Sequence, residues 1–174
     1  MNASSGIQVG LIRLATLVLF LAFCSQPQAS SASNPCGTNL AAQTKRFVDD
    51  MRVKDIDDIL ALYTPDATFF DPSGATITGS DALRTFYQHI FATYDSDLIL
   101  TPNTFSKTSS HGIQLCVESG KYTENMRVRS TMEMQHPHGT YRFTYCLRHS
   151  PDRNPEWLLY RQQWGDDQLS KTQH

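Results

Sequence analysis

The sequence lacks the features that identify nucleic-acid-binding, metal-binding and nucleotide-binding proteins. Lysine and arginine together number 15 against 17 aspartates and glutamates, and no cluster of basic residues occurs. Nucleic acid and anionic membrane surfaces select basic patches, so neither is the expected partner. There is also no glycine-rich phosphate loop, no recognisable serine or cysteine nucleophile and no zinc-ligand spacing. The expected partner is therefore a small molecule or another protein, with no cofactor and no metal.

Long hydrophobic runs are missing as well. The apolar run from Leu14 to Phe23 is well short of the roughly 20 residues that a membrane-spanning helix needs. It follows a segment with a single basic side chain, Arg13, and precedes the small residues Ser31-Ala32-Ser33. These three regions predict a signal peptide over residues 1–33. We therefore expect export to the periplasm or the cell exterior, with no integral membrane segment in the mature chain.

A lipoprotein signal is the alternative to a cleaved, soluble export signal. The segment Leu21-Ala22-Phe23-Cys24 approximates a lipobox, but Phe23 stands where a small residue is expected before the cysteine. Lipidation is therefore the lesser alternative.

Cysteine is scarce. Without the signal peptide, only Cys36, Cys116 and Cys146 remain. An oxidising compartment favours one disulfide and one free thiol, although the sequence does not decide which two residues pair. The alternative is that Cys116 and Cys146 are simply small buried residues.

The remaining chain of about 140 residues suits one domain with one core. We expect a short tail over residues 34–38, the domain over residues 39–165 and a polar tail over residues 166–174.

Helical patterns occupy the first part of this domain. The first predicted helix spans residues 39–52, with Thr38 or Asn39 as the cap. The second begins after Asp55 and continues through Tyr63 until Pro65 stops it. The turn at residues 71–74 reads Asp-Pro-Ser-Gly and follows a short strand at residues 67–70. A third helix opens at residues 80–81.

Strand patterns follow. They cover residues 98–105, 113–122, 126–134, 140–148 and 157–164. Helices first and strands afterwards predict an α+β domain, in which a curved, mostly antiparallel sheet wraps around the N-terminal helices. Such a cone leaves a pocket at its open end, lined by alternate strand residues.

Several motifs resemble a known superfamily. They read ALYTPDATFFDPSG, ITGSDALRTFY, ESGKYT, YRFTYCLRHS and EWLLYRQQWG. Together they resemble the nuclear transport factor two-like superfamily, which includes the SnoaL-like proteins and, more distantly, the ketosteroid isomerases. The last three motifs are most similar to bacterial proteins related to the calcium/calmodulin-dependent protein kinase II association domain. The superfamily hosts several chemistries on one scaffold, so the resemblance implies the fold more firmly than the function.

Asp71 is the candidate catalytic residue. The resemblance places it at the general base of the ketosteroid isomerases, and a carboxylate at the lip of an apolar pocket suits that role. Alternatively, Asp71 only accepts hydrogen bonds within its own turn. The isomerases also hold an oxyanion with a tyrosine and a protonated acid, and Phe47 and Thr144 stand at those positions here. True steroid isomerisation would need a different oxyanion site.

Arg142 is the candidate anion-binding residue, because the related association domains have an arginine on the matching strand that points into the cavity. An inward Arg142 would bring Thr144 and Cys146 inward with it. Asp71, Glu118 or a bound acid would then be its partner, and a pairing with protein would be purely structural.

The last predicted strand supplies an aromatic wall. Tyr160, Gln162 and Trp164 share one face, which is the cavity side by resemblance to the isomerases. Ordinary core packing explains the same pattern. The full set of expected ligand-binding residues is Phe47, Tyr63, Glu118, Arg142, Thr144, Tyr160, Gln162 and Trp164.

Three functional classes stay open at this point, and the sequence does not decide whether the protein is an enzyme. The first is a cofactor-free isomerase or dehydratase that uses Asp71. The second is a non-catalytic binding module in which Arg142 holds an anionic ligand. The third is a homodimeric association module, which predicts an apolar exposed sheet face around Phe143, Tyr145 and Leu159. A homodimer is expected from the resemblance in any of these classes.

Overall fold

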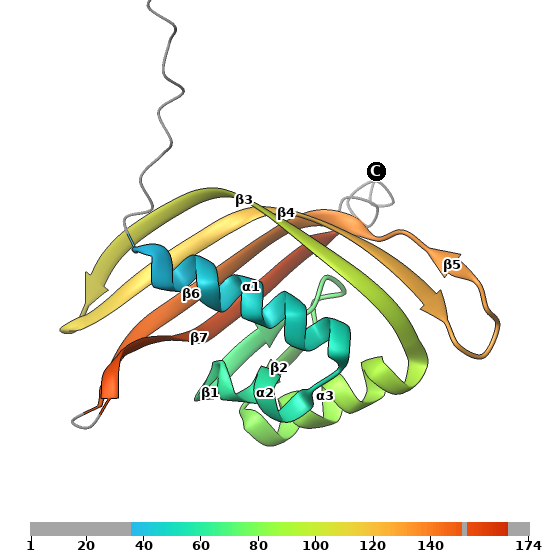
Figure 1. The fold of residues 1–174 in the computed structure, drawn as a ribbon, viewed down its shortest axis with the longest axis horizontal. Helices are drawn as coiled ribbons and strands as arrows, with labels where there is room; N and C mark the ends of the chain where they lie inside the picture. Colours follow the sequence, from blue (N-terminus) through green and yellow to red (C-terminus); the bar gives the residue numbers. More distant parts are fainter. Residues whose placement is uncertain (1–35, 151–152, 167–174) are drawn as a thin grey trace, which may run out of the picture. The chain divides into compact units, whose positions relative to one another are not determined.

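Three helices lie on the concave side of a strongly curved sheet in the computed structural model (Figure 1). The structure describes residues 36–150 and 153–166. The elements are α1 Thr38–Val53, α2 Ile56–Ala61, β1 Tyr63–Phe70, β2 Thr76–Thr78, α3 Ser80–Thr93, β3 Tyr94–Ser110, β4 Ile113–Val128, β5 Met134–Gln135, β6 His138–Ser150 and β7 Arg153–Asp166. The predicted signal peptide and most of the predicted C-terminal tail lie outside the described residues.

The sheet has seven strands in the order β2-β1-β7-β6-β4-β3, and β5 pairs with β4. Among the strand pairs of the described residues, only β1 and β7 are parallel. The long strands β3, β4, β6 and β7 are joined in sequence by antiparallel pairing of β3 with β4, β4 with β6 and β6 with β7. The α+β class and the mostly antiparallel sheet are therefore confirmed.

The three predicted helices form, but their boundaries differ in instructive ways. Asp55 caps α2 as predicted, because its side chain accepts a hydrogen bond from the backbone N–H of Asp58 at 3.0 Å. The helix then ends at Ala61, before the predicted stop. The carbonyl of Leu62 instead accepts the backbone N–H of Leu159 at 2.8 Å. Pairing with a strand nearly a hundred residues away has overridden the local helical pattern.

The strand predicted at residues 126–134 is wrong. Residues 126–128 continue β4, and the chain then turns, with the backbone N–H of Val128 bonded to the carbonyl of Glu133 at 2.9 Å. Met132 within the turn has a φ of 61°. What read as one strand is the end of a long strand followed by a reversal into the two-residue β5.

Close backbone approach helps to bend the long hairpin. A Cβ added at Gly120 would lie 2.2 Å from the backbone oxygen of Thr101. The pairing register of β3 and β4 shifts next to this point, between Pro102 and Thr104. Glycine and a register shift at the same place are the usual means by which a strand bends.

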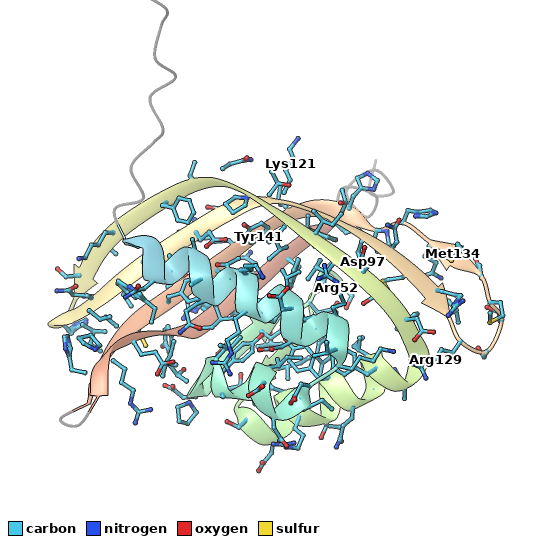
Figure 2. All side chains as sticks on the ribbon, in the orientation of Figure 1. Arg52, Asp97, Lys121, Arg129, Met134 and Tyr141 are labelled. Atoms are coloured by element: carbon cyan, nitrogen blue, oxygen red, sulfur yellow. A yellow bond between two sulfur atoms is a disulfide. The ribbon has the colours of Figure 1, made fainter. Side chains whose placement is uncertain are left out.

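The inner face of β6 carries the core. Tyr141, Phe143 and Tyr145 are 2%, 0% and 3% exposed, whereas Arg142 between them is exposed. In Figure 2, Tyr141 lies on the helix side of the sheet and Lys121 projects away from it. The expected inward orientation of Arg142 is therefore wrong: its two neighbours in the strand point inward, and Arg142 points outward. The exposed apolar sheet face expected around Phe143, Tyr145 and Leu159 is also wrong, because all three are buried.

Two of the cysteines that follow the predicted signal peptide are paired, and the third is free. Cys36 and Cys116 form a disulfide, with Cα atoms 6.0 Å apart and 80 residues apart in sequence. Cys146 is a free, half-buried thiol. One disulfide and one free thiol were expected, and the structure identifies the pair. Among the described residues, no helix is both long enough and apolar enough to span a membrane.

Candidate functional site

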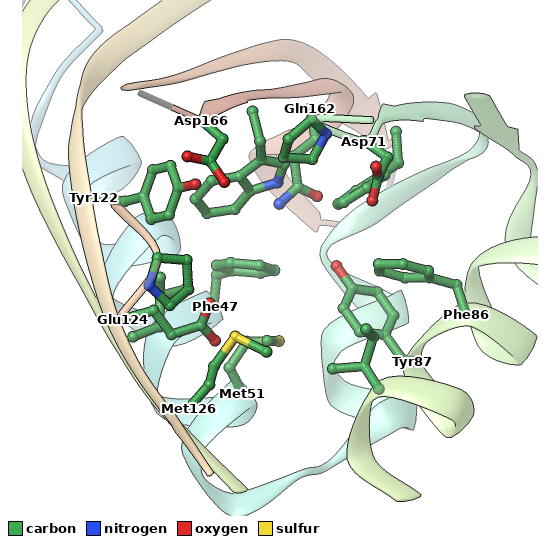
Figure 3. Close-up of a pocket in the computed structure, with 16 residues that line it drawn as sticks. Phe47, Met51, Asp71, Phe86, Tyr87, Tyr122, Glu124, Met126, Gln162 and Asp166 are labelled. Carbon is green, nitrogen blue, oxygen red and sulfur yellow. The ribbon is translucent and has the colours of Figure 1, made fainter. Parts of the chain in front are cut away.

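A cavity of about 250 Å³ lies between the inner face of the sheet and helices α1 and α3 (Figure 3). Sites for drug-sized ligands occupy about 300–1,000 Å³, so this cavity suits a small molecule. Apolar side chains from both layers make most of its wall: Phe47, Met51, Phe69, Phe86, Ile90, Leu98, Met126 and Trp164.

Three carboxylates line the same cavity. They are Asp71, Glu124 and Asp166. No arginine, lysine or histidine lines it among the residues that the structure describes. The cavity is thus apolar in its walls and acidic in its charged groups.

Asp71 lies in the turn between β1 and β2, at the edge of the cavity. Its Oδ1 accepts the backbone N–H of Ser73 at 2.6 Å, and its own carbonyl accepts the N–H of Gly74 at 2.9 Å. The side chain is half-buried and lines the cavity. The turn contacts expected for an aspartate here are present, and they fix a carboxylate that also faces the cavity.

Glu124 is a site residue that the sequence analysis did not identify. It is half-buried, and burial raises the pKa of its carboxyl group, an effect that a hydrogen bond with Ser96 partly offsets. The alternation of Tyr122, Glu124 and Met126 in one strand could have revealed it. That signal was hidden because β4 was expected to end at residue 122.

Gln162 connects the cavity to a buried pair of tyrosines. The hydroxyls of Tyr63 and Tyr87 are 2.6 Å apart, and the Tyr63 hydroxyl donates a hydrogen bond to Oε1 of Gln162. Burial raises the pKa of both tyrosines, so both stay neutral donors. Gln162 is fully buried, and its Nε2 has no hydrogen-bond partner in the described part of the chain. Its amide lies close enough to the Tyr87 hydroxyl to lower the pKa of that group, although burial raises this pKa overall.

Glu118 belongs to a different cluster. It is 0% exposed, and its carboxyl group accepts hydrogen bonds from the hydroxyls of Thr44 and Tyr141, each at 2.7 Å. The Tyr145 hydroxyl lies 2.9 Å from that of Thr44. Burial raises the pKa of Glu118. The cluster borders a second hollow, between α1 and β3, and not the cavity that holds Asp71.

The other expected ligand-binding residues are divided by the strand geometry. Phe47, Gln162 and Trp164 line the cavity, and Tyr63 lies behind its wall. Arg142 lies in an outer groove with Thr140 and Gln163.

Thr144 and Tyr160 are half-buried and do not line the cavity. The register of β6 and β7 shifts beside Tyr160, because Thr144 pairs with Arg161 while Tyr145 pairs with Leu159. This bulge breaks the alternation that had grouped Tyr160 with Gln162.

The loop histidines have ordinary local partners. Nδ1 of His136 lies 2.9 Å from the side-chain oxygen of Asn125, and Nδ1 of His138 lies 3.2 Å from the carbonyl of His136. Within residues 36–150 and 153–166, no group of histidine, cysteine, aspartate or glutamate side chains is arranged to hold a metal ion.

Solved structures share this architecture at low sequence identity. A ketosteroid isomerase-like protein from Erwinia carotovora atroseptica is 19% identical with a TM-score of 0.61, covering 74% of this chain and 94% of that one. A candidate calcium/calmodulin-dependent protein kinase II association domain from Xanthomonas campestris is 14% identical with a TM-score of 0.59, covering 78% and 92%. A candidate scytalone dehydratase from Novosphingobium aromaticivorans is 11% identical with a TM-score of 0.57, covering 72% and 79%. At these identities the likeness concerns the fold alone.

Comparison with the curated proteins finds no match. The sequence model of the SnoaL-like domain matches residues 44–150, which is more than half of the chain. This match begins within α1 and covers α2, α3, the Asp71 turn and all but the last of the long strands. The protein belongs to the SnoaL-like domain family.

Proposed function

We propose that this protein is an exported SnoaL-like enzyme that binds a small molecule in the cavity and moves a proton on it without a cofactor. The fold itself suggests a small-molecule-binding or isomerase- or dehydratase-type domain. Asp71 acts as the general base in this proposal. The observation that carries it is a half-buried carboxylate at the edge of an apolar cavity that no basic side chain lines among the described residues.

The expected chemistry is removal of a proton from a carbon next to a carbonyl group. A carboxylate can take such a proton, and its efficiency improves when water is partly excluded. Asp71 is held in place by the backbone of its own turn, so it does not have to be ordered when the ligand binds.

Negative charge that develops on the carbonyl oxygen needs a donor. Two groups in the cavity can supply one: the Nε2 of Gln162 and the carboxyl group of Glu124. Burial raises the pKa of Glu124 and favours its protonated form. A protonated Glu124 can return a proton to the product in an isomerisation or donate it to a departing hydroxyl in a dehydration. Figure 3 shows Asp71 and Glu124 on different sides of the cavity, with room for a ligand between them.

Solvent exchange tests this proposal without knowledge of the natural substrate. We expect the protein to speed deuterium incorporation from solvent into the carbon next to the carbonyl of 2-tetralone, followed by nuclear magnetic resonance. Asp71→Asn should lower that rate on the order of a hundredfold, the usual contribution of a general base. Asp66→Asn changes an exposed aspartate of β1 and is the matched control. Equal exchange rates in the Asp71→Asn variant and the wild type would remove Asp71 as the base.

Export and homodimer formation complete the proposal. The Cys36–Cys116 disulfide supports export, because disulfides persist in oxidising compartments. Among the described residues, the helices cover only the inner face of the sheet, and Arg142 is exposed on the outer face, where a second copy can pack. Fractionation of the producing cells and light scattering of the purified protein test the two statements; cytosolic retention or a monomer mass would contradict them.

A further inference from the structure

We propose that the cavity selects a small organic cation, with its ammonium group near Glu124 and its apolar body against the aromatic wall. This inference rests on the proposed function and deepens it by naming the class of ligand. It reverses the sign of ligand charge that an inward Arg142 would have implied.

The charged side chains that line the cavity are the first argument for a cationic ligand. Three carboxylates and no basic side chain face the cavity among the described residues. In a partly dry cavity, carboxylates repel an anionic ligand and attract a cationic one much more strongly than in water. Burial already disfavours the ionised form of Glu124, and a bound cation would restore it. With a cation bound, Glu124 is therefore ionised, and Nε2 of Gln162 is the donor to the oxygen of the ligand.

Three basic side chains that lie close in sequence to cavity residues bind a carboxylate outside the cavity. Lys54, Arg127 and Arg129 all bind the carboxylate of Asp95, with N–O distances of 2.6, 2.9 and 2.6 Å. None of the three lines the cavity. On β4, Arg127 is exposed and alternates with Glu124 and Met126, which line the cavity. The acidic character of the cavity is therefore not cancelled by these neighbours.

The aromatic rings of the cavity wall are the second argument for a cationic ligand. Tyr122 and Trp164 meet edge to face with ring centroids 4.9 Å apart, and Phe86 meets Tyr87 at 5.3 Å. Phe47 closes the same cavity from α1. Figure 3 shows Tyr122 across the space from Phe86 and Tyr87, with Glu124 and Asp166 on the side of Tyr122. Aromatic faces attract organic ammonium ions, and cages of this kind recognise quaternary ammonium groups.

Gln162 indicates, independently of the charge, that the ligand carries a hydrogen-bond acceptor. Its Nε2 is fully buried, lacks a partner among the described residues and belongs to the cavity wall. A buried donor without an acceptor is costly, so a ligand that supplies an acceptor oxygen is favoured there. Because Tyr63 donates to Oε1, the amide orientation that leaves Nε2 for the ligand is fixed by its neighbour. The inferred ligand is thus an ammonium compound with an oxygen acceptor.

A pair of compounds of equal shape tests the inference on the unmodified protein. The cation 4′-(trimethylammonio)acetophenone and the neutral 4′-tert-butylacetophenone differ only in the charge of one centre. We expect titration calorimetry to show that the cation binds at least about tenfold more tightly, as expected for a single favourable charge contact. Equal or tighter binding of the neutral compound overturns the inference and leaves a binding cavity in place.

Variants identify the side chains that contact the ammonium group and the carbonyl oxygen of the ligand. Glu124→Gln should weaken binding of the cation severalfold and leave binding of the neutral compound unchanged, whereas Glu133→Gln, an exposed control, should change neither. Gln162→Leu should weaken both ketones equally and should not affect phenyltrimethylammonium, which has no oxygen. If neither ketone binds the wild type, the inference fails. The role of Asp71 is judged separately, by solvent exchange.

Discussion

The inner and outer faces of the same strands carry opposite charges. On β4, Glu118 and Glu124 point inward, whereas Lys121 and Arg127 are exposed on the outer face. On β6, Arg142 is exposed between two buried aromatic residues. On β4, an inward acid and an exposed base thus lie three residues apart, on opposite faces of the same strand.

The physical reason lies in what each group can do when it is buried. A carboxylic acid taken out of water can accept a proton and become neutral, which lowers the cost of burial. A guanidinium group stays charged at any physiological pH, so it needs a buried anion or contact with water. The acidic inner face therefore costs less than a basic inner face would, and it defines which ligands the cavity can hold.

The largest expected effect contrasts the two faces directly. Phe143→Ala removes a ring that is 0% exposed and packs against Trp164 and Phe47 with centroid distances of 5.4 and 5.7 Å. We expect the free energy of unfolding to fall by about 3–5 kcal/mol. The neighbouring Arg142→Ala should change it by about 0.5 kcal/mol or less. Urea denaturation measures both, and a loss of similar size in the two variants would contradict the assignment of the faces.

The next effect concerns pH and the inner face. Because burial raises the pKa of Glu118, the folded state binds a proton more tightly than the unfolded state. This contribution is complete below the unfolded pKa of about 4.5 and is lost as pH rises through the folded pKa. Each pKa unit between the folded and the unfolded state corresponds to about 1.4 kcal/mol in the free energy of unfolding. Glu118→Gln should therefore flatten the decline of stability between about pH 4.5 and neutrality.

Urea midpoints at several pH values measure this difference between wild type and Glu118→Gln. Glu124→Gln serves as a second variant, because burial raises the pKa of that residue as well. If the difference in stability between wild type and Glu118→Gln does not change with pH, Glu118 has the same pKa in the folded and the unfolded protein, which contradicts the prediction.

The smallest expected effect lies on the exposed side. Lys54, Arg127 and Arg129 hold the pKa of Asp95 well below its usual range. Its contribution to stability is therefore present above the unfolded pKa of about 3.8 and is lost as pH falls below it, the opposite direction to Glu118. Asp95→Asn should lower the melting temperature slightly near pH 7, and 1 M salt should remove most of the difference. A large difference that persists in high salt would mean that the cluster is not screened by solvent.

Much of the fold was predictable from the sequence. The amphipathic pattern of α1, the Asp55 cap, the Asp-Pro-Ser-Gly turn and four of the five later strand patterns are local signals, and these elements formed. Errors occurred where distant pairing decided the outcome. Residues 62–63 joined the sheet because β7 lies beside them, and the strand expected at residues 126–134 became the end of β4 and a turn.

The candidate site was predictable only in part. Asp71, Phe47, Gln162 and Trp164 were correctly expected to face one cavity. Arg142 was placed on the wrong face, because the motif identifies a strand without fixing which of its alternate residues points inward. Tyr160 was misplaced by a bulge.

The sequence by itself determined the fold class, the family and the turn that holds Asp71, since these depend on patterns repeated over many residues or on one local motif. Only the tertiary structure decided the sign of charge inside the cavity. Side chains alternate faces along a strand, so a shift of one residue exchanges an arginine for a phenylalanine. That alternation is set by the register of pairing between β4, β6 and β7 and by the bulge beside Tyr160, which are properties of contacts between distant segments.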